Sequence, residues 1–473
     1  MNNNIAGNSF HKNLYNHYEH YCEQTISSNR IVHKEINQLL EKIKQRNLFT
    51  VKRLGESIEG RDINLISFGK GKTNILAWTQ MHGDEPTATA AVSDVLNFFS
   101  SDDEFKHVRD SILSNVTIHI IPMLNPDGAE KHQRENSINI DINRDASRAE
   151  SPESKILLDA ARSLKPDFGF NLHDQNSYYT AGKANRTAAI SLLAPPFDYD
   201  KSISEARTKS MKAILHIFNV LSEYIPGHIA RYSDDFEPRA FGDRFTKMGI
   251  SSILIESGFI KGDYDKSEIR KLNFVALLSV FYSIAEKHYE TIDSKKYFEI
   301  PENESLLFDL LLRNLSLNGK NKSYKIDVGI NREKYFDPAN NTFYHKGKIE
   351  QIGDLSVFYG IEEYDFSGLM IELPLITNNY YNLKDIYNLD FNKLYCEKIA
   401  FLRLKEGKLD ASFTKLPINI ITRTKSPSLW LKSDEMANFV VIKKGKARFI
   451  IINGFFKDLS NSENSIHNGW VID

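Results

Sequence analysis

A histidine and a glutamate stand three residues apart at His82 and Glu85, just after the apolar run from Asn74 to Thr79. Zinc accepts imidazole and carboxylate ligands, and catalytic zinc sites commonly use three protein ligands and one water. Gly83 lets the backbone turn tightly between the two residues, so both side chains can face one point. Taken alone, this spacing arises often by chance and is more typical of an ordinary surface loop, so other residues must decide.

His173 and Glu256 each follow directly on an apolar segment, at 168–172 and at 251–255. The histidine is a candidate third ligand, although an isolated histidine of this kind is more often a packed core or loop residue. The glutamate is harder to explain structurally, because burying a carboxylate is costly unless a partner or a metal compensates. A hydrolytic zinc site needs a base near its water, and glutamate suits that role.

A third group of side chains is suited to binding anions. The turn at 125–128, Asn-Pro-Asp-Gly, is followed by Arg134 and then by Asn143 and Arg144. Arginine is always charged and binds carboxylates through two parallel hydrogen bonds. For any one of these residues alone, a solvated polar loop with ion pairs is the simpler interpretation.

The order of the surrounding segments predicts an α/β fold. A helical pattern covers 10–47 and a hairpin pattern covers 49–68. Beyond them, apolar strand patterns alternate with helical patterns, which is typical of an α/β layer with a parallel or mixed sheet. Ligands bind beyond the strand ends of such sheets, where the histidines and Glu256 stand. The predicted strands are 74–79, 116–122, 168–172 and 251–255, and the predicted helices are 87–99, 154–164 and 206–224.

The pattern of apolar and turn-forming residues changes after about residue 290. The segment 301–304, Pro-Glu-Asn-Glu, looks like a boundary, and short alternating segments separated by Asn, Gly, Asp and Pro follow it. A typical domain has about 100–200 residues, so a chain of 473 suggests two domains. We therefore expect a three-layer α/β/α sandwich with a mixed central sheet at 1–295, followed by a smaller β-rich domain at 296–473.

Together these motifs resemble the zinc carboxypeptidase family, the carboxypeptidase A-like metallocarboxypeptidases. The resemblance covers about residues 50–260 and does not extend beyond residue 290. Each motif is short, but six in the family's order are a specific signal. They are Gly55-Glu56-Ser57-Ile58-Glu59-Gly60-Arg61, His82-x-x-Glu85, Asn125-Pro126-Asp127-Gly128, Arg134-x-Asn136 with Asp141-x-Asn143-Arg144-Asp145, Leu172-His173, and the strand before Glu256.

The resemblance implies a set of catalytic roles. It implies one zinc ion per chain, held by His82, Glu85 and His173. Glu256 would be the general base and then the proton donor. Arg134 would polarise the scissile carbonyl and stabilise the oxyanion.

The resemblance also implies a peptide substrate with a free C-terminal carboxylate, which Asn143 and Arg144 would bind. The bond cleaved could be an ordinary peptide bond or a γ-linked one. The nearest candidate for the family's active-site tyrosine is Tyr232, for which an ordinary packed or exposed tyrosine is at least as good an interpretation. Two positions depart from the family: Asp84 stands where many digestive members carry an arginine, and Asn171 where an aspartate is common.

Two other functions are compatible with the sequence. Succinylglutamate desuccinylases and aspartoacylases, which cleave N-acyl amino acids, are similar to the His-Gly-Asp-Glu, Asp-x-Asn-Arg and Leu-His motifs of this chain. The 125–128 turn, the 55–61 hairpin and the spacing from Arg134 to Arg144 favour the peptidase. The third interpretation is an inactive carboxypeptidase-like scaffold, which a measurement of zinc content would distinguish from both enzymes.

The composition is that of an ordinary globular protein, with 41% hydrophobic and 26% charged residues. The formal charge of -2 gives no sign of the clustered positive charge typical of nucleic-acid binding. Cys22 and Cys396 form no disulfide framework and favour a reducing compartment. No signal-peptide pattern and no run of about 18 apolar residues occurs, so we expect a cytoplasmic protein without membrane or nucleic-acid partners. The oligomeric state is not predicted.

Overall fold

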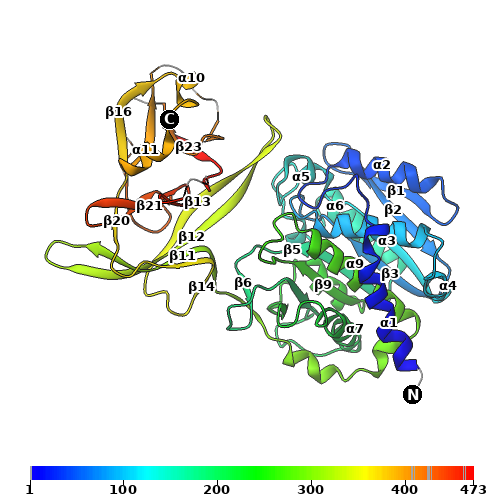
Figure 1. Cartoon of the computed structure of the whole chain (residues 1–473). Helices are drawn as coiled ribbons and strands as arrows, with labels where there is room; N and C mark the ends of the chain where they lie inside the picture. The colour runs from blue at the N-terminus through cyan, green and yellow to red at the C-terminus, as the bar shows by residue number, and fades with distance from the viewer. Residues whose placement is uncertain are drawn as a thin grey trace. The chain divides into compact units, whose positions relative to one another are not determined.

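The computed structural model describes residues 3–405, 409, 411–422, 427, 429–461, 463 and 465–472. It divides the chain into two compact units, Met1–Ser305 and Leu306–Asp473 (Figure 1). The first unit reaches past the boundary expected at residue 295, because β10 (Asn303–Ser305) pairs with β6 (Tyr179–Ala181). No helix among these described residues is long and apolar enough to cross a lipid bilayer.

The first unit is built on one mixed sheet of eight strands, in the order β1-β2-β4-β3-β5-β9-β7-β8. The central strands β4, β3, β5 and β9 run parallel, whereas β2 and β7 pair antiparallel with them at either side. The mixed sheet predicted from the sequence is confirmed. The strands are β1 Thr50–Glu56, β2 Asp62–Gly69, β3 Thr73–Trp78, β4 Val116–Ile121, β5 Phe168–Asp174, β7 Ile190–Leu193, β8 Ile229–Arg231 and β9 Ser251–Ser257.

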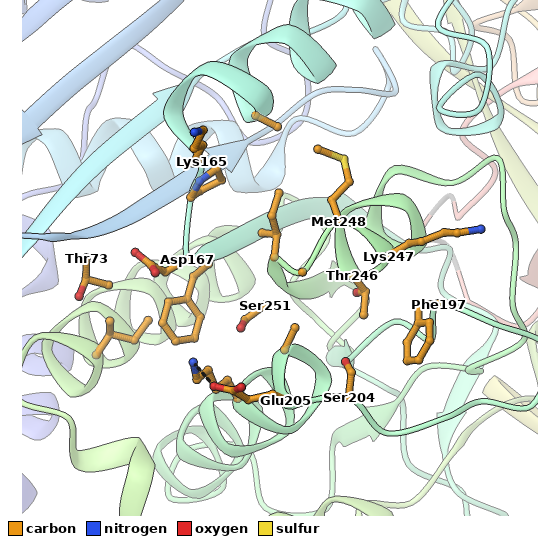
Figure 2. A pocket seen from close by; sticks show the side chains of 18 of the residues that line it. Thr73, Lys165, Asp167, Phe197, Ser204, Glu205, Thr246, Lys247, Met248 and Ser251 are labelled. Atoms are coloured by element: carbon orange, nitrogen blue, oxygen red, sulfur yellow. Dashed lines mark ion pairs between the residues drawn. The ribbon is translucent and has the colours of Figure 1, made fainter.

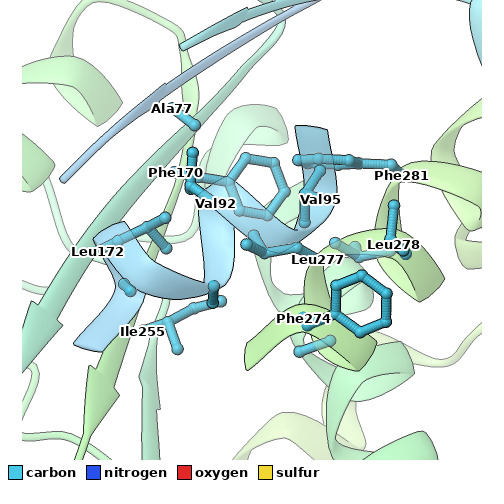
Figure 3. Close-up of a cluster of buried hydrophobic side chains, with 14 of the residues drawn as sticks. Ala77, Val92, Val95, Phe170, Leu172, Ile255, Phe274, Leu277, Leu278 and Phe281 are labelled. Atoms are coloured by element: carbon cyan, nitrogen blue, oxygen red, sulfur yellow. The ribbon is translucent and has the colours of Figure 1, made fainter. Parts of the chain in front are cut away.

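Helices cover both faces of this sheet, because side chains alternate between the faces along each strand. In β3, Ile75 and Ala77 join the core that contains α3 and α9, whereas Leu76 and Trp78 join the core that contains α6 and α8. Figure 3 shows part of the first core, where side chains of β5 and β9 meet those of α3 and α9. The expected α/β/α sandwich is therefore confirmed. The helices are α3 Thr87–Ser100, α4 Lys106–Asn115, α6 Pro152–Leu164, α7 Glu205–Leu221, α8 Phe241–Lys247 and α9 Ser267–Ala285.

The N-terminal region is not the continuous helix predicted at 10–47. Asp94 of α3 holds the connection in a non-helical path, accepting hydrogen bonds from the Tyr18 hydroxyl at 2.8 Å and the Glu23 N–H at 2.7 Å. Arg270 of α9 pairs with the same buried carboxylate and donates to the carbonyl of Glu23. These tertiary contacts outweigh the local helical pattern. The observed elements are α1 Asn3–Asn16, η1 Tyr18–His20 and α2 His33–Lys44.

The second unit is β-rich, as predicted. Its larger sheet has the order β13-β12-β11-β15-β20-β21-β22, with β14 also paired to β11, and its smaller sheet has the order β16-β17-β19-β23-β18. The larger sheet consists of β11 Leu307–Asn318, β12 Ser323–Asp337, β13 Thr342–Gly353, β14 Tyr359–Asp365, β15 Met370–Glu372, β20 Phe439–Lys443, β21 Lys446–Ile452 and β22 Phe455–Asp458. The smaller sheet consists of β16 Leu375–Tyr381, β17 Ile399–Leu404, β18 Phe413–Thr414, β19 Asn419–Ile421 and β23 Gly469–Ile472.

Candidate active site

His82, Glu85 and His173 converge where the parallel strands end. His82 and Glu85 lie in the turn between β3 and α3, and His173 lies near the end of β5. Glu85 Oε1 is 2.7 Å from His82 Nδ1, and Glu85 Oε2 is 2.7 Å from His173 Nδ1. All three side chains are buried, and one ligand atom from each lies within 4.8 Å of the others. The structure thus brings together the three ligands nominated from the sequence.

The donor atoms of these three residues fit a zinc ion. The two histidine Nδ1 atoms are 3.1 Å apart, and two ligands each about 2.0–2.1 Å from one zinc ion can be separated by up to ~4 Å. Burial disfavours ionisation of Glu85, yet the two adjacent imidazoles hold its pKa well below the usual value. The set therefore offers two nitrogens and a carboxylate to a divalent cation.

Asp141 connects the first candidate ligand to Arg134. Its Oδ1 is 3.2 Å from His82 Nε2, and its Oδ2 accepts a hydrogen bond from Arg134 Nε at 3.1 Å. A carboxylate on the second nitrogen of a ligating histidine fixes the tautomer and orientation of the ring. Arg134 Nη1 lies 3.0 Å from His82 Nδ1, so its guanidinium borders the candidate metal position. This role of Asp141 was not predicted from the sequence, although the residue begins the Asp-x-Asn-Arg motif.

Asn125 and Gly83 tie the histidine loop to the arginine loop. Asn125 Oδ1 caps α5 (Pro126–Lys131) by accepting from the Gly128 N–H at 2.9 Å, and its Nδ2 donates to the carbonyls of Met81 and Arg134, each at 3.2 Å. A Cβ on Gly83 would lie 2.0 Å from the carbonyl carbon of Gly128. Glycine is therefore required at this close approach.

Asp127 connects the 55–61 hairpin to the loops of the site through hydrogen bonds. Its buried carboxylate accepts hydrogen bonds from the Ser57 hydroxyl at 2.7 Å, the Glu59 N–H at 2.9 Å and Arg61 Nη1 at 2.6 Å. The hairpin thus neutralises a buried charge at the start of α5 and holds the loop that leads to Arg134.

Glu256 lies in β9 directly beside His173 of β5. Burial and the negative charge of Glu85 raise the pKa of Glu256 to about 8. Burial and the charge of Glu256 raise the pKa of the Tyr232 hydroxyl, which lines the same cleft. Within the described part of the chain, the Glu256 carboxylate has no hydrogen-bond partner, so it remains available to a ligand.

One cleft of about 520 Å³ collects every candidate from the sequence. Asn143 Oδ1 accepts a hydrogen bond from the Phe241 N–H at 2.9 Å, and Arg144 Nε lies 3.7 Å from Glu237 Oε2. The Arg144 side chain is 42% exposed, so its guanidinium stays open to a ligand. The candidates that line the cleft are His82, Glu85, Arg134, Asn143, Arg144, His173, Tyr232 and Glu256.

Four further side chains in the cleft extend the site. Asp84 and Asn171, the two departures from the family, each bury an Oδ1 atom that has no hydrogen-bond partner among the described residues. Burial, together with the charge of Glu85, raises the pKa of Asp84 to about 6. Lys266 and Asp174 form an ion pair of 3.0 Å. This pair was not predicted from the sequence, because no motif marks the segment between β9 and α9 that carries Lys266.

A larger cavity, of about 970 Å³, lies at the opposite ends of the same strands (Figure 2). Thr73, Phe168 and Ser251, the first residues of β3, β5 and β9, line it, and Lys165 and Lys247 also contribute. None of the candidate site residues does. Ligands of such sheets bind beyond the carboxyl ends of the strands, so the smaller cleft is the candidate active site.

Comparison with known proteins relates part of the first unit to a known family. Residues 36–216 match the family model described as zinc carboxypeptidase. The chain contains a zinc carboxypeptidase domain. The matched residues include His82, Glu85, Arg134 and His173, whereas Glu256 lies beyond them.

Two curated relatives of the zinc carboxypeptidase domain match over short stretches. Carboxypeptidase SOL1 of Arabidopsis thaliana is 29% identical over 103 residues, which are 20% of this chain and 21% of that protein. Carboxypeptidase B of Astacus astacus is 35% identical over 99 residues, which are 20% of this chain and 32% of that protein. The chain thus spans about a fifth to a third of the length of these relatives.

Solved structures are similar over a larger part of the chain. A metallo-carboxypeptidase from Burkholderia cenocepacia aligns with 19% identity and a TM-score of 0.46, covering 55% of this chain and 70% of that one. Carboxypeptidase A from Helicoverpa armigera aligns with 13% identity and a TM-score of 0.43, covering 59% of this chain and 80% of that one.

Proposed function

We propose that this protein is a zinc-dependent metallocarboxypeptidase that hydrolyses the C-terminal bond of a peptide, either an ordinary or a γ-linked bond. The observation that carries the proposal is the lining of one cleft by a His-Glu-His set, a buried glutamate and two arginines. Hydrolysis at a peptide end requires these parts: a metal site, a base, a group that stabilises the oxyanion, and a carboxylate clamp.

His82, Glu85 and His173 would hold one zinc ion through two imidazole nitrogens and a carboxylate. When bound, zinc supplies an activated water and polarises the scissile carbonyl. Glu256 accepts a proton from the attacking water and then delivers it to the leaving amine. Its position beside His173 in the neighbouring strand supports this role.

Arg134 stabilises the negative oxygen that develops during attack, because its fixed positive charge borders the candidate ligands. Asn143 and Arg144 bind the terminal carboxylate of the substrate. The Phe241 N–H already occupies Asn143 Oδ1, and this orientation leaves the Nδ2 group as a donor for a carboxylate. Tyr232, which lines the same cleft, is a further substrate contact.

The two cysteines support a reducing compartment as the place of this reaction. Cys22 is partly buried and Cys396 is exposed, and both are free thiols. Free, exposed thiols persist in reducing compartments. We therefore place the reaction in the cytoplasm.

The first test is mass spectrometry of a mixed peptide pool incubated with zinc-loaded protein, with Glu256→Gln as the matched control. We expect the wild type alone to remove single C-terminal residues, and the products to reveal the preferred side chain. Hydrolysis of N-acyl amino acids without any peptide trimming would contradict the peptidase and favour a deacylase. A protein that binds no zinc would contradict both enzymes and favour a binding scaffold.

A further inference from the structure

The two carboxylate oxygens of Glu85 have different neighbours in the cleft. Oε1 lies 3.4 Å from Arg134 Nη1, and Asp141 joins this arginine to the proposed carboxylate clamp. Oε2 accepts a hydrogen bond from the Asp174 N–H at 3.1 Å, and the Asp174 side chain holds Lys266. Through its two oxygens, Glu85 therefore contacts Arg134 and Asp174, the residue that is paired with Lys266.

The Lys266–Asp174 ion pair turns its cation toward the cleft. The Asp174 side chain is 9% exposed and accepts hydrogen bonds from Lys266 Nζ at 3.0 Å and from the Thr87 hydroxyl at 2.5 Å. The Lys266 side chain is 24% exposed, and it lines the cleft. A molecule entering the cleft therefore meets the ammonium group more readily than its counter-ion.

One N–H group of the Lys266 ammonium has no acceptor among the described residues. The ammonium carries three N–H groups. One is directed to Asp174 and a second to the carbonyl of Ser257 at 3.4 Å. Among the described residues the third has no acceptor, and a carboxylate from a ligand would supply one with a charge-assisted hydrogen bond.

The backbone around Lys266 is fixed in an unfavourable conformation. Its φ is +56°, in the left-handed region that residues other than glycine rarely adopt. Asp263 stabilises the turn, because its carboxylate accepts the N–H groups of Glu268 and Ile269, each at 3.1 Å. The turn thus holds the lysine among the residues that line the cleft.

We propose that Lys266 forms a substrate subsite for the carboxylate of an aspartate or glutamate side chain that precedes the cleaved bond. The inference rests on the proposed peptidase function. A peptide whose terminal carboxylate is bound by Asn143 and Arg144 has its last bond over the candidate metal ligands. Lys266 lines the same cleft beside Asp174, within reach of a residue that precedes this bond, so the enzyme prefers acidic C-terminal tails.

The test compares peptides that differ only by Glu or Gln at one of the two positions before the cleaved bond. For the wild type we expect kcat/KM for the better Glu peptide to exceed that of its Gln partner about five- to tenfold at low salt. The preference should shrink as the salt concentration rises, since the pair is partly exposed. Lys266→Met should bring the ratio close to one, and Lys266→Arg should retain most of it.

The ratio of two peptides on one enzyme preparation does not depend on the fraction of active protein, so partial misfolding of a variant leaves the test valid. Lys261→Met is the matched control, because Lys261 is exposed in the same segment and does not line the cleft. It should keep the wild-type ratio. Equal trimming of Glu and Gln peptides by the wild type would overturn the subsite and leave the peptidase intact. Trimming of neither peptide by zinc-loaded protein would overturn both.

Discussion

Glu256 and His173 are direct neighbours across the β5–β9 pair. Both residues stand at the carboxyl ends of parallel strands, whose spacing is ~4.8 Å. The sheet itself, rather than a loop, therefore sets the position of the proposed base relative to a proposed ligand. This arrangement makes the two roles separable by substitution, because Glu256 is not one of the three grouped metal ligands.

Replacing Glu256 with Gln should separate metal binding from turnover. The amide has nearly the same shape but cannot accept a proton, and loss of a general base lowers kcat by about 10²–10⁴-fold. We expect one zinc ion per chain by elemental analysis and an unchanged circular dichroism spectrum. His173→Ala is the complementary variant and should lose zinc. Turnover by Glu256→Gln above a tenth of the wild-type rate would contradict the assigned base.

Replacing Arg144 with Ala should impair only substrates that end in a free carboxylate. A charge-assisted hydrogen bond contributes about 1.5–3 kcal/mol, so KM should rise about tenfold or more. Amidated versions of the same peptides cannot use the clamp, so the wild type and Arg144→Ala should hydrolyse them with similar KM values. Arg148→Ala is the control, since Arg148 is exposed nearby and does not line the cleft. An equal loss on amidated peptides would argue against a clamp.

Replacing Asp141 with Ala should weaken zinc binding although Asp141 is not one of the three proposed ligands. Its carboxylate lies 3.2 Å from His82 Nε2, and loss of such a partner typically lowers metal affinity 10–100-fold. The measurement is competition with a chelator of known affinity. Asp141→Asn keeps one oxygen acceptor and should lose less. Equal zinc affinity in all three proteins would show that Asp141 does not orient the ligand.

The candidate site residues that could be predicted from the sequence are those whose positions are set by the order of the strands. His82, His173 and Glu256 come just after apolar segments, and parallel strands bring such ends together whatever the loops do. The mixed sheet and its two helical layers were predictable for the same reason, because the alternation of strand and helix patterns is strong. The structure accordingly collects these side chains in one cleft.

Features that depend on contacts distant in the chain were not predictable. The helical pattern at 10–47 is interrupted, because Asp94 and Arg270 bind the connecting backbone from two other helices. The first unit ends at Ser305 because a three-residue strand pairs with β6. Lys266 reaches Asp174 only through a turn that no local motif announces.

Asn453 should be essential to the second unit. It lies at φ +49° in an Asn-Gly turn, and its side chain accepts the Gly347 N–H at 2.7 Å and donates to the His345 carbonyl at 2.7 Å. Its own N–H donates to Asn438 at 2.9 Å. Asn453→Ala leaves buried polar groups unpaired and should lower the free energy of unfolding by about 2–4 kcal/mol.

Hydrogen exchange in the full chain measures this loss, because it reports the second unit separately from the first. Protection of β20 and β21 should fall in Asn453→Ala while protection of β3 and β5 is retained. Asn321→Ala, at an exposed turn, is the control and should change stability by no more than about 0.5 kcal/mol. Unchanged protection of β20 and β21 would mean that the asparagine contacts contribute little.

Glu23 should make the first unit sensitive to acid. Burial opposes its ionisation, but hydrogen bonds from Lys42 Nζ at 2.6 Å, the Thr25 hydroxyl at 2.8 Å and Asn97 Nδ2 at 3.3 Å outweigh this and lower the pKa to about 2. Because the folded-state pKa lies below the unfolded value of about 4.3, the charged form stabilises the fold above that value. The contribution is lost as the pH falls from about 4.3 to 2, so Glu23→Gln should show a smaller decline in melting temperature over this window than the wild type.

At pH 7 the Glu23→Gln variant should be less stable than the wild type by about 1–2 kcal/mol. The control is Glu19→Gln, at an exposed position, which should match the wild type both at pH 7 and over the acid window. Parallel acid profiles for the wild type and Glu23→Gln would mean that this carboxylate titrates alike in the folded and unfolded chains.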